Sequence, residues 1–316
     1  MGEILMPGTQ PAAEPDLFAD PEAFLAAYGF GIAPVAEVPA PCSPEAADSG
    51  LAGLIDEGVP VIVLAPHLGD AVLSCGALMT YALSRTQVTV VTFFTEGGRA
   101  PYTMSAWRYL REVREPDAGA VYQRRRAQDR AALEPLGITC VHAGLTEAPF
   151  RRRPASLSRS RLARLVPEFA HIYPTYRAHV TSGHIVAADA GTLREVREII
   201  HRMAGPGLHL VLAPLGKGGH VDHVLVRNAA LSSGAPAAFY REIPHDRRDP
   251  ASDAFVYRHG LAATRWSEQA GDKAELIRTY ESQPCTRFRG AGIPLEPEVF
   301  FSAGRPCTAA SSAWWR

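Results

Sequence analysis

Two separate stretches of the chain share one pattern, in which an apolar run ends near a proline and is followed by a polar loop and a helical pattern. In the first, Val61–Leu64 precedes His67 and Asp70; in the second, Leu208–Ala213 precedes Gly219–His223. Apolar, β-branched runs of this length are typical of buried parallel strands. Because open α/β sheets form their sites at the carboxyl ends of strands, the pattern predicts an α/β fold whose two loops contribute to one site.

The rest of the chain alternates strand and helix patterns between residues 58 and 316. We expect strands at 61–64, 87–94, 138–142, 208–213 and 237–241, and helices at 71–84, 120–136, 157–168, 190–203, 220–231 and 273–280. This alternation predicts a doubly wound, mainly parallel, Rossmann-like sheet. Residues 1–57, with helical patterns at 21–28 and 44–55, are predicted to form an N-terminal extension. No Gly-x-Gly-x-x-Gly follows a strand in the sequence, which disfavours a dinucleotide cofactor.

Composition excludes several classes of partner. The net charge is −1, so nothing marks the chain for nucleic acid or an anionic membrane, and Arg151–Arg153 is interpreted as a solvated or phosphate-facing run. No apolar run approaches the roughly 20 residues that cross a bilayer. The first residues lack a basic and apolar signal pattern, so a cytoplasmic location is expected. The five cysteines show no C-x-x-C spacing and are expected to be free thiols.

His67, Asp70 and His223 are the candidate ligands of one divalent metal. A catalytic zinc needs three protein ligands and an open position for water. The three-residue spacing of His67 and Asp70 on a tight turn allows both side chains to point to one centre. In isolation this spacing also suits an aspartate in the first turn of a helix, where the helix dipole favours a negative charge. The histidines of the second loop favour the interpretation as metal ligands, and we expect one Zn²⁺ per chain.

These residues resemble the motifs of the PIG-L or LmbE-like family of zinc-dependent N-deacetylases. The family's first motif, (Ala/Pro)-His-Pro-Asp-Asp-Glu or Pro-His-Leu-Asp-Asp-Ala, stands here as Pro66–Ala71, and its second, Gly-His-x-Asp-His, is intact at Gly219–His223. Three further segments resemble family landmarks: residues 125–137, 145–151 and 280–283. The resemblance covers about residues 58–303. It implies the LmbE-like α/β fold with loop insertions, and an N-acetyl amino sugar as substrate.

The resemblance also implies roles for other residues. His220 would stabilise the oxyanion beside the metal, and an imidazolium held by Asp222 would suit that negative charge. Arg125 would lie near substrate hydroxyls or phosphate, although a helix-surface charge is an equal alternative. Glu147, after the third strand, could accept hydrogen bonds from sugar hydroxyls. Gly69 stands where the family has the aspartate that acts as general base.

Gly69 leaves more than one function open, because removing a general base typically lowers the rate by about 10²–10⁴. A zinc-dependent N-deacetylase of natural-product biosynthesis could use a base from elsewhere, with Glu96 and Asp222 as candidates. Alternatively, the chain is an altered or inactive homologue that binds a metabolite or partner, or does different chemistry at the same metal. A glycine here can also simply relax the turn.

The stretch Tyr102–Gly119 is expected to overhang the site, since it follows the second strand at the same edge of the sheet. Tyr102, Trp107 and Tyr109 could stack on a sugar ring or pack as the core of a lid. A small-molecule substrate is expected, and a homo-oligomer is possible.

Overall fold

A computed structural model of the chain describes residues 44–153, 166–216, 218–233, 237–243, 250–278 and 296–303. They lie in a compact unit that runs from Pro39 to Arg316. The strands are β1 Val61–Ala65, β2 Val88–Glu96, β3 Thr139–Thr146, β4 Leu210–Pro214, β5 Ala237–Tyr240, β6 Leu261–Trp266 and β7 Glu298–Ala303. The α-helices are α2 Pro44–Asp56, α3 Asp70–Leu83, α4 Met104–Glu112, α5 Ala118–Leu133, α8 Ala190–Ala204, α9 Val221–Ser232, α10 Pro250–Arg258 and α11 Ala270–Arg278.

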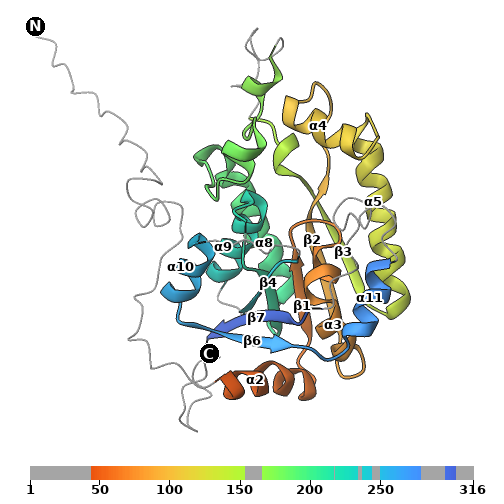
Figure 1. The fold of residues 1–316 in the computed structure, drawn as a ribbon, viewed down its shortest axis with the longest axis vertical. Helices are drawn as coiled ribbons and strands as arrows, with labels where there is room; N and C mark the ends of the chain where they lie inside the picture. The colour runs from red at the N-terminus through yellow and green to blue at the C-terminus, as the bar shows by residue number, and fades with distance from the viewer. Residues whose placement is uncertain are drawn as a thin grey trace, which may run out of the picture. The chain divides into compact units, whose positions relative to one another are not determined.

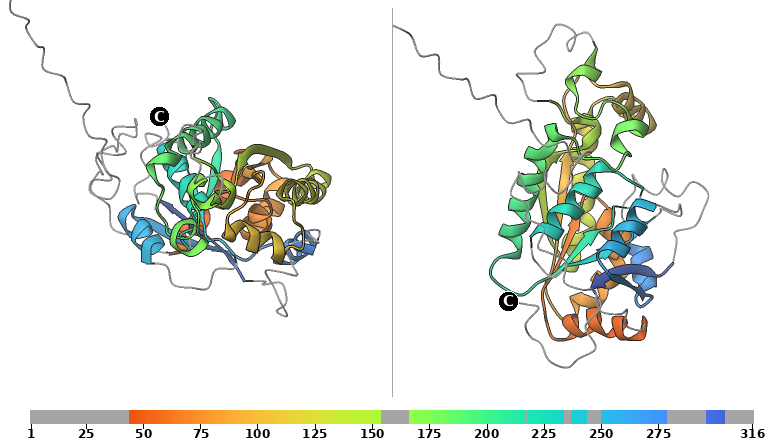
Figure 2. Two further views of the ribbon diagram at one scale, coloured as in Figure 1. Left: turned by 90° about the horizontal axis from the view of Figure 1, so that it is seen from above. Right: turned by 90° about the vertical axis from the view of Figure 1, so that its left-hand side faces the viewer.

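The strands form one seven-stranded sheet in the order β3-β2-β1-β4-β5-β7-β6 (Figure 1). Strands β1 to β5 are parallel, and β7 and β6 continue the sheet in antiparallel pairing. The right-handed rule for parallel crossovers places α3 and α5 on one face and α8 and α9 on the other. Figures 1 and 2 show α8 and α9 on the side away from α5. The predicted doubly wound, mainly parallel sheet is therefore confirmed.

One core cluster lies between this sheet and helix α3. Val61 and Val63, which alternate on β1, belong to it together with Cys75 of α3. Leu51 and Ile55 of α2 enter the same cluster, so the helix predicted at 44–55 is present and packs into the core. The boundary predicted at residue 58 stays a prediction. Among the described residues, no helix is both long and apolar enough to cross a membrane.

Two strands and two α-helices of the described chain were not expected from the sequence. Strand β6 reads Leu-Ala-Ala-Thr-Arg-Trp, whose two alanines have low β-propensity, and it is defined by its pairing with β7. The unexpected helices are α4 and α10. Of the helix predicted at 157–168, residues 157–165 lie outside the described residues, and the remainder begins a 3₁₀ turn, Pro167–Ala170. The patterns at 21–28 and 280–283 also lie outside them.

Helix α4 covers the loop that follows β1. It begins after Thr103, whose side chain accepts a hydrogen bond from the Ala106 backbone N–H at 3.2 Å. Its apolar side chains Ala106 and Leu110 pack in one cluster with Leu68 of that loop and with Phe150. The predicted insertion is thus a helix that packs on the loop carrying His67 and Asp70.

Candidate metal centre

The site lies where the order of strands in the sheet reverses. Strands β1 and β4 are adjacent and parallel, so the loops that follow them meet at one edge of the sheet. The first loop turns sharply at Gly69, whose φ of +92° suits glycine, and α3 begins at Asp70. The second loop leads into α9, whose first turn carries His223.

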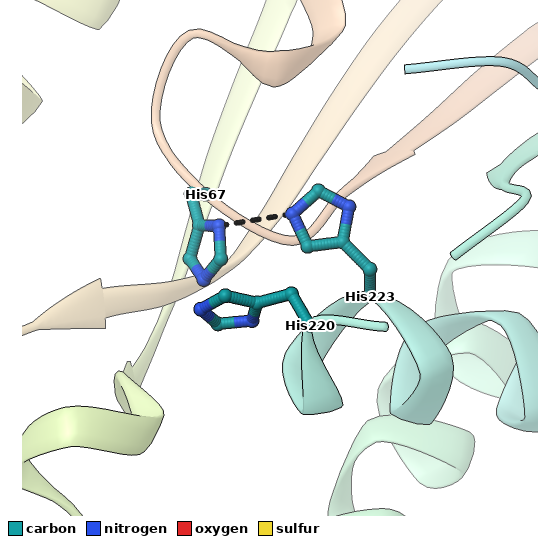
Figure 3. A group of neighbouring side chains, drawn as sticks. All are labelled: His67, His220 and His223. Atoms are coloured by element: carbon teal, nitrogen blue, oxygen red, sulfur yellow. Dashed lines mark hydrogen bonds between the residues drawn. The ribbon is translucent and has the colours of Figure 1, made fainter. Parts of the chain in front are cut away.

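Three potential ligand atoms converge there. His67 Nδ1 lies 3.2 Å from His223 Nε2, and each of these nitrogens lies 3.4 Å from Asp70 Oδ2. Figure 3 shows the His67 and His223 rings turned toward each other, with His220 beside them. All three predicted ligands are buried, with relative exposures of 4–6%. The structure therefore brings together the three side chains that the sequence singled out.

The outer nitrogens of both histidines face buried carboxylates. His67 Nε2 lies 3.1 Å from Asp222 Oδ2, and His223 Nδ1 lies 2.9 Å from Glu242 Oε1. With a cation bound, the ring N–H in each pair would donate to the carboxylate, and the lone pair of the inner nitrogen would face the cation. Metal-binding histidines are commonly fixed in this way.

These distances fit a tetrahedral metal. Zinc lies about 2.0–2.2 Å from nitrogen and oxygen ligands, and tetrahedral angles then place ligand atoms about 3.3–3.6 Å apart. The observed separations of 3.2–3.4 Å agree. The charge agrees as well: burial opposes a positive charge on His67, yet Glu147, Asp222 and Asp70 raise its pKa to about 10. The donor set and its excess of negative charge suit a divalent cation.

His220 forms the N-cap of α9 beside this centre. Its Nδ1 accepts a hydrogen bond from the Asp222 backbone N–H at 3.3 Å, which places the ring proton on Nε2. The ring packs edge-on against His67, with centroids 4.7 Å apart. Desolvation and the charge of His67 hold the pKa of His220 well below its usual value. His220 is therefore a neutral donor here, whereas the sequence suggested an imidazolium.

The Asp222 carboxylate does not hold the His220 ring as the sequence suggested; only the Asp222 backbone N–H contacts it. Its fully buried carboxylate contacts His67, accepts the Ala148 backbone N–H at 2.9 Å and is ion-paired with Arg151. Burial opposes the charged form, but Arg151 and His67 hold the pKa of Asp222 well below its usual range. A carboxylate engaged in this way is poorly suited to act as a general base.

Arg151 is buried, so the interpretation of Arg151–Arg153 as a solvated or phosphate-facing run is wrong for this residue. Its guanidinium joins Asp222 to Asp189, and it also donates to the Thr146 carbonyl. Arg152 and Arg153 are exposed, as expected. The first arginine of the run thus forms ion pairs with two buried carboxylates.

The remaining predicted residues lie around His67 and helix α5. Glu96 pairs with Arg126 at 2.6 Å. Glu147 accepts the Tyr122 hydroxyl, and its Oε1 lies 3.8 Å from His67 Nε2, the nitrogen that points away from the other ligand atoms. The Arg125 side chain is only 11% exposed and donates to the Leu68 carbonyl, so it is not a surface charge. The catalytic and substrate roles of these residues stay predictions.

Glu242 and the buried position of Arg151 were not predicted from the sequence. Glu242 follows β5, which pairs with β4, and its Oε1 also accepts the Gly216 backbone N–H at 2.7 Å. A polar residue directly after a predicted strand was the available signal, and it is the same signal that identified His67. Arg151 gave no comparable signal, because a run of three arginines resembles a surface.

The sheet order and the His-Asp-His cluster define an α/β protein with a candidate metal site at its topological switch point. Comparison with known proteins is more specific: residues 62–233 match the model of the GlcNAc-PI de-N-acetylase (PIG-L) family, and the chain belongs to that family. The matched region contains all three predicted metal ligands, His220 and Asp222.

Three of the similar proteins are deacetylases by name. The chain is 29% identical over 196 residues to 2′-N-acetylparomamine deacetylase of Streptomyces fradiae. The matched residues make up 61% of this chain and 60% of that protein. The fold of this chain is similar to that of a zinc-inhibited form of teicoplanin deacetylase Orf2. The TM-score is 0.56 at 21% identity, and the match covers 77% of this chain and 97% of that one. The A40926 pseudoaglycone deacetylase Dbv21 gives a TM-score of 0.54 at 22% identity, covering 78% and 97%.

Proposed function

We propose that this chain is a metal-dependent hydrolase that removes an acetyl group from the nitrogen of an amino sugar. The observation that carries the proposal is the triangle of His67 Nδ1, Asp70 Oδ2 and His223 Nε2, with edges of 3.2–3.4 Å. The named activity of the aminoglycoside relative supports an N-acetylated amino sugar of a natural product as substrate. Zinc is the proposed metal, because two imidazoles and one carboxylate suit it.

A divalent metal, when bound here, polarises the amide carbonyl and lowers the pKa of water. The protein's own residues supply the remaining steps. The Nε2–H of His220 donates a hydrogen bond to the carbonyl oxygen as negative charge develops on it. Asp222 and Glu242 keep His67 and His223 in the tautomers that present lone pairs to the metal.

Proton transfer is the step that this arrangement of residues supports least. Gly69 has no side chain, and the carboxylates of Glu96 and Asp222 are engaged by arginines. An amide also needs a proton on its leaving nitrogen. We therefore expect deacetylation slower by about 10²–10⁴ than with a base at this position.

Gly69 also favours a second candidate function. A family member that lacks the base but keeps the ligand triangle can bind an acylated sugar without hydrolysing it, or use the metal for different chemistry. The two functions differ in one measurable property, the release of free amine.

The test is amine release from N-acetylated aminoglycosides and N-acetylglucosaminides by the protein loaded with Zn²⁺. The parent should release amine and His223→Ala should not. His201→Ala, which changes an exposed histidine on α8, should match the parent. Equal release by the parent and His223→Ala would refute the hydrolase, and sugar binding measured calorimetrically in the same samples would then support the second candidate.

A further inference from the structure

A second group of metal-binding side chains lies between the edge strand β3 and helix α5. Cys140 and His142 alternate on β3 and so share a face, and α5 presents Asp129 to that face. His142 Nε2 lies 2.8 Å from Asp129 Oδ2 and 3.3 Å from Cys140 Sγ, and the sulfur lies 3.5 Å from the same carboxylate oxygen. Three different donor types therefore meet at one point.

This geometry does not suit a cysteine nucleophile. A relay needs the thiol at one ring nitrogen and the carboxylate at the other. Here Cys140 Sγ and Asp129 Oδ2 both contact His142 Nε2. Burial and the charge of Asp129 also raise the pKa of Cys140 to about 12, so the thiol is protonated and unreactive without a cation.

We propose that Asp129, Cys140 and His142 form a second Zn²⁺ site, separate from the centre at His67, Asp70 and His223. Thiolate, imidazole and carboxylate are the donors that zinc accepts, and tetrahedral geometry places a zinc-bound sulfur about 3.5 Å from the other ligand atoms. The observed sulfur distances are 3.3 and 3.5 Å. The 2.8 Å contact is a hydrogen bond, and it would open by about half an ångström as the cation replaces the proton.

Asp129 is already held in position for this role. Its other oxygen, Oδ1, accepts the Gly69 backbone N–H at 3.2 Å, while Oδ2 faces His142 and Cys140. The site therefore needs little rearrangement of its carboxylate. The hydrogen bond from the Gly69 backbone N–H to Asp129 also connects the second site to the loop that carries the first.

The second site binds zinc more weakly than the first. The His142 side chain is 5% exposed, and within the described residues its Nδ1 has no hydrogen-bond partner. The outer nitrogens of His67 and His223, by contrast, both face carboxylates. Loss of such an outer partner typically lowers metal affinity by about 10–100-fold, so the second site fills after the first.

Cobalt is the probe that separates the two sites, because only the second contains a thiolate. Co²⁺ bound to a cysteine sulfur gives a near-ultraviolet charge-transfer absorption that histidine and aspartate ligands do not give. The parent should show this absorption, Cys140→Ser should lack it, and Cys75→Ser, which removes the other described cysteine, should keep it. His223→Ala should also keep it, so that failure of the proposed deacetylase leaves this result readable.

A Zn²⁺ titration gives the second measurement. The parent should bind one more equivalent than Cys140→Ser, and the additional equivalent should have a Kd about 10–100-fold larger than the first. Three outcomes would overturn the proposal. They are a parent that binds Co²⁺ without the thiolate absorption, an absorption that survives in Cys140→Ser, and an absorption that disappears in His223→Ala.

Discussion

Gly69 determines whether the site has a general base on the loop after β1. Its φ of +92° lies in the region that favours glycine, and its backbone N–H donates to Asp129 Oδ1. An L-residue at such a φ is strained by roughly 1–2 kcal/mol, with asparagine and aspartate the best tolerated. The missing carboxylate and the left-handed turn therefore occur at the same residue.

Comparing Gly69→Asp with Gly69→Asn separates these two effects. Both variants should lose about 1–2 kcal/mol of unfolding free energy in urea titrations, because both are strained in the same way. Only aspartate restores a base, so Gly69→Asp should release amine about 10²-fold or more faster than Gly69→Asn. Equal rates in the two variants would show that a carboxylate at this position does not act as a base in this protein.

At the scale of elements, adjacent strand ends supply the two parts of the site. The loops after β1 and β4 carry His67 and lead to His223, and the residues after β5 add Glu242 behind His223. Parallel neighbours end at the same edge of the sheet, so the ligand and its supporting carboxylate come from different elements. This arrangement makes the affinity for metal depend on β5 as well.

Glu242→Gln should therefore lower zinc affinity by about 10–100-fold, measured by competition with a chromophoric chelator. Glutamine keeps the size of the side chain but offers only a neutral oxygen to the His223 N–H. Glu96→Gln is the matched control, because Glu96 pairs with Arg126 on α5. The zinc affinity of this variant should stay at the parent value. An unchanged affinity in Glu242→Gln would show that this hydrogen bond does not support the metal.

Helix α4 should control access to the site. It packs on Leu68 and exposes Trp107, which is 42% exposed and stands edge-on to Tyr102. Trp107→Ala should raise the KM for an amino sugar substrate while metal content stays the same, because aromatic faces stack on sugars. Tyr257→Ala, which removes an exposed aromatic from α10, should leave both unchanged. An unaltered KM in Trp107→Ala would argue against α4 as a lid.

At the scale of the whole molecule, the parallel sheet and the convergence of His67, Asp70 and His223 were predictable, and the contacts that support them were not. Strands such as Val61–Ala65 are continuous apolar runs, and Gly137, with a φ of +79°, ends the helical region directly after the helix predicted at 120–136. The partner of Asp222 was missed. His220 precedes α9 in an extended conformation, and the Asp222 carboxylate pairs with Arg151, a residue distant in sequence.

Metal removal should destabilise the whole domain, because the ligands belong to a folded centre. A metal that binds only the folded state at 100 times its Kd adds about 2.7 kcal/mol, or roughly 5–10 °C in Tm for a domain of this size. Without a cation, the buried carboxylate of Asp70 loses the positive charge that it would bind. Excess chelator should lower the Tm of the parent by this amount, and added Zn²⁺ should restore it.

The control for this melting experiment is a double variant, His67→Ala with His223→Ala, whose Tm should respond to chelator only through the second proposed site and therefore less than that of the parent. Cys140→Ser should keep the larger part of the parent's response, because its first site is intact; the two variants together separate the two proposed sites. If metal analysis shows that the chelator has stripped the parent while its Tm is unchanged, the cation does not support the fold. The carboxylates and histidines would then hold one another, as the 3.1 and 2.9 Å contacts of His67 with Asp222 and of His223 with Glu242 allow.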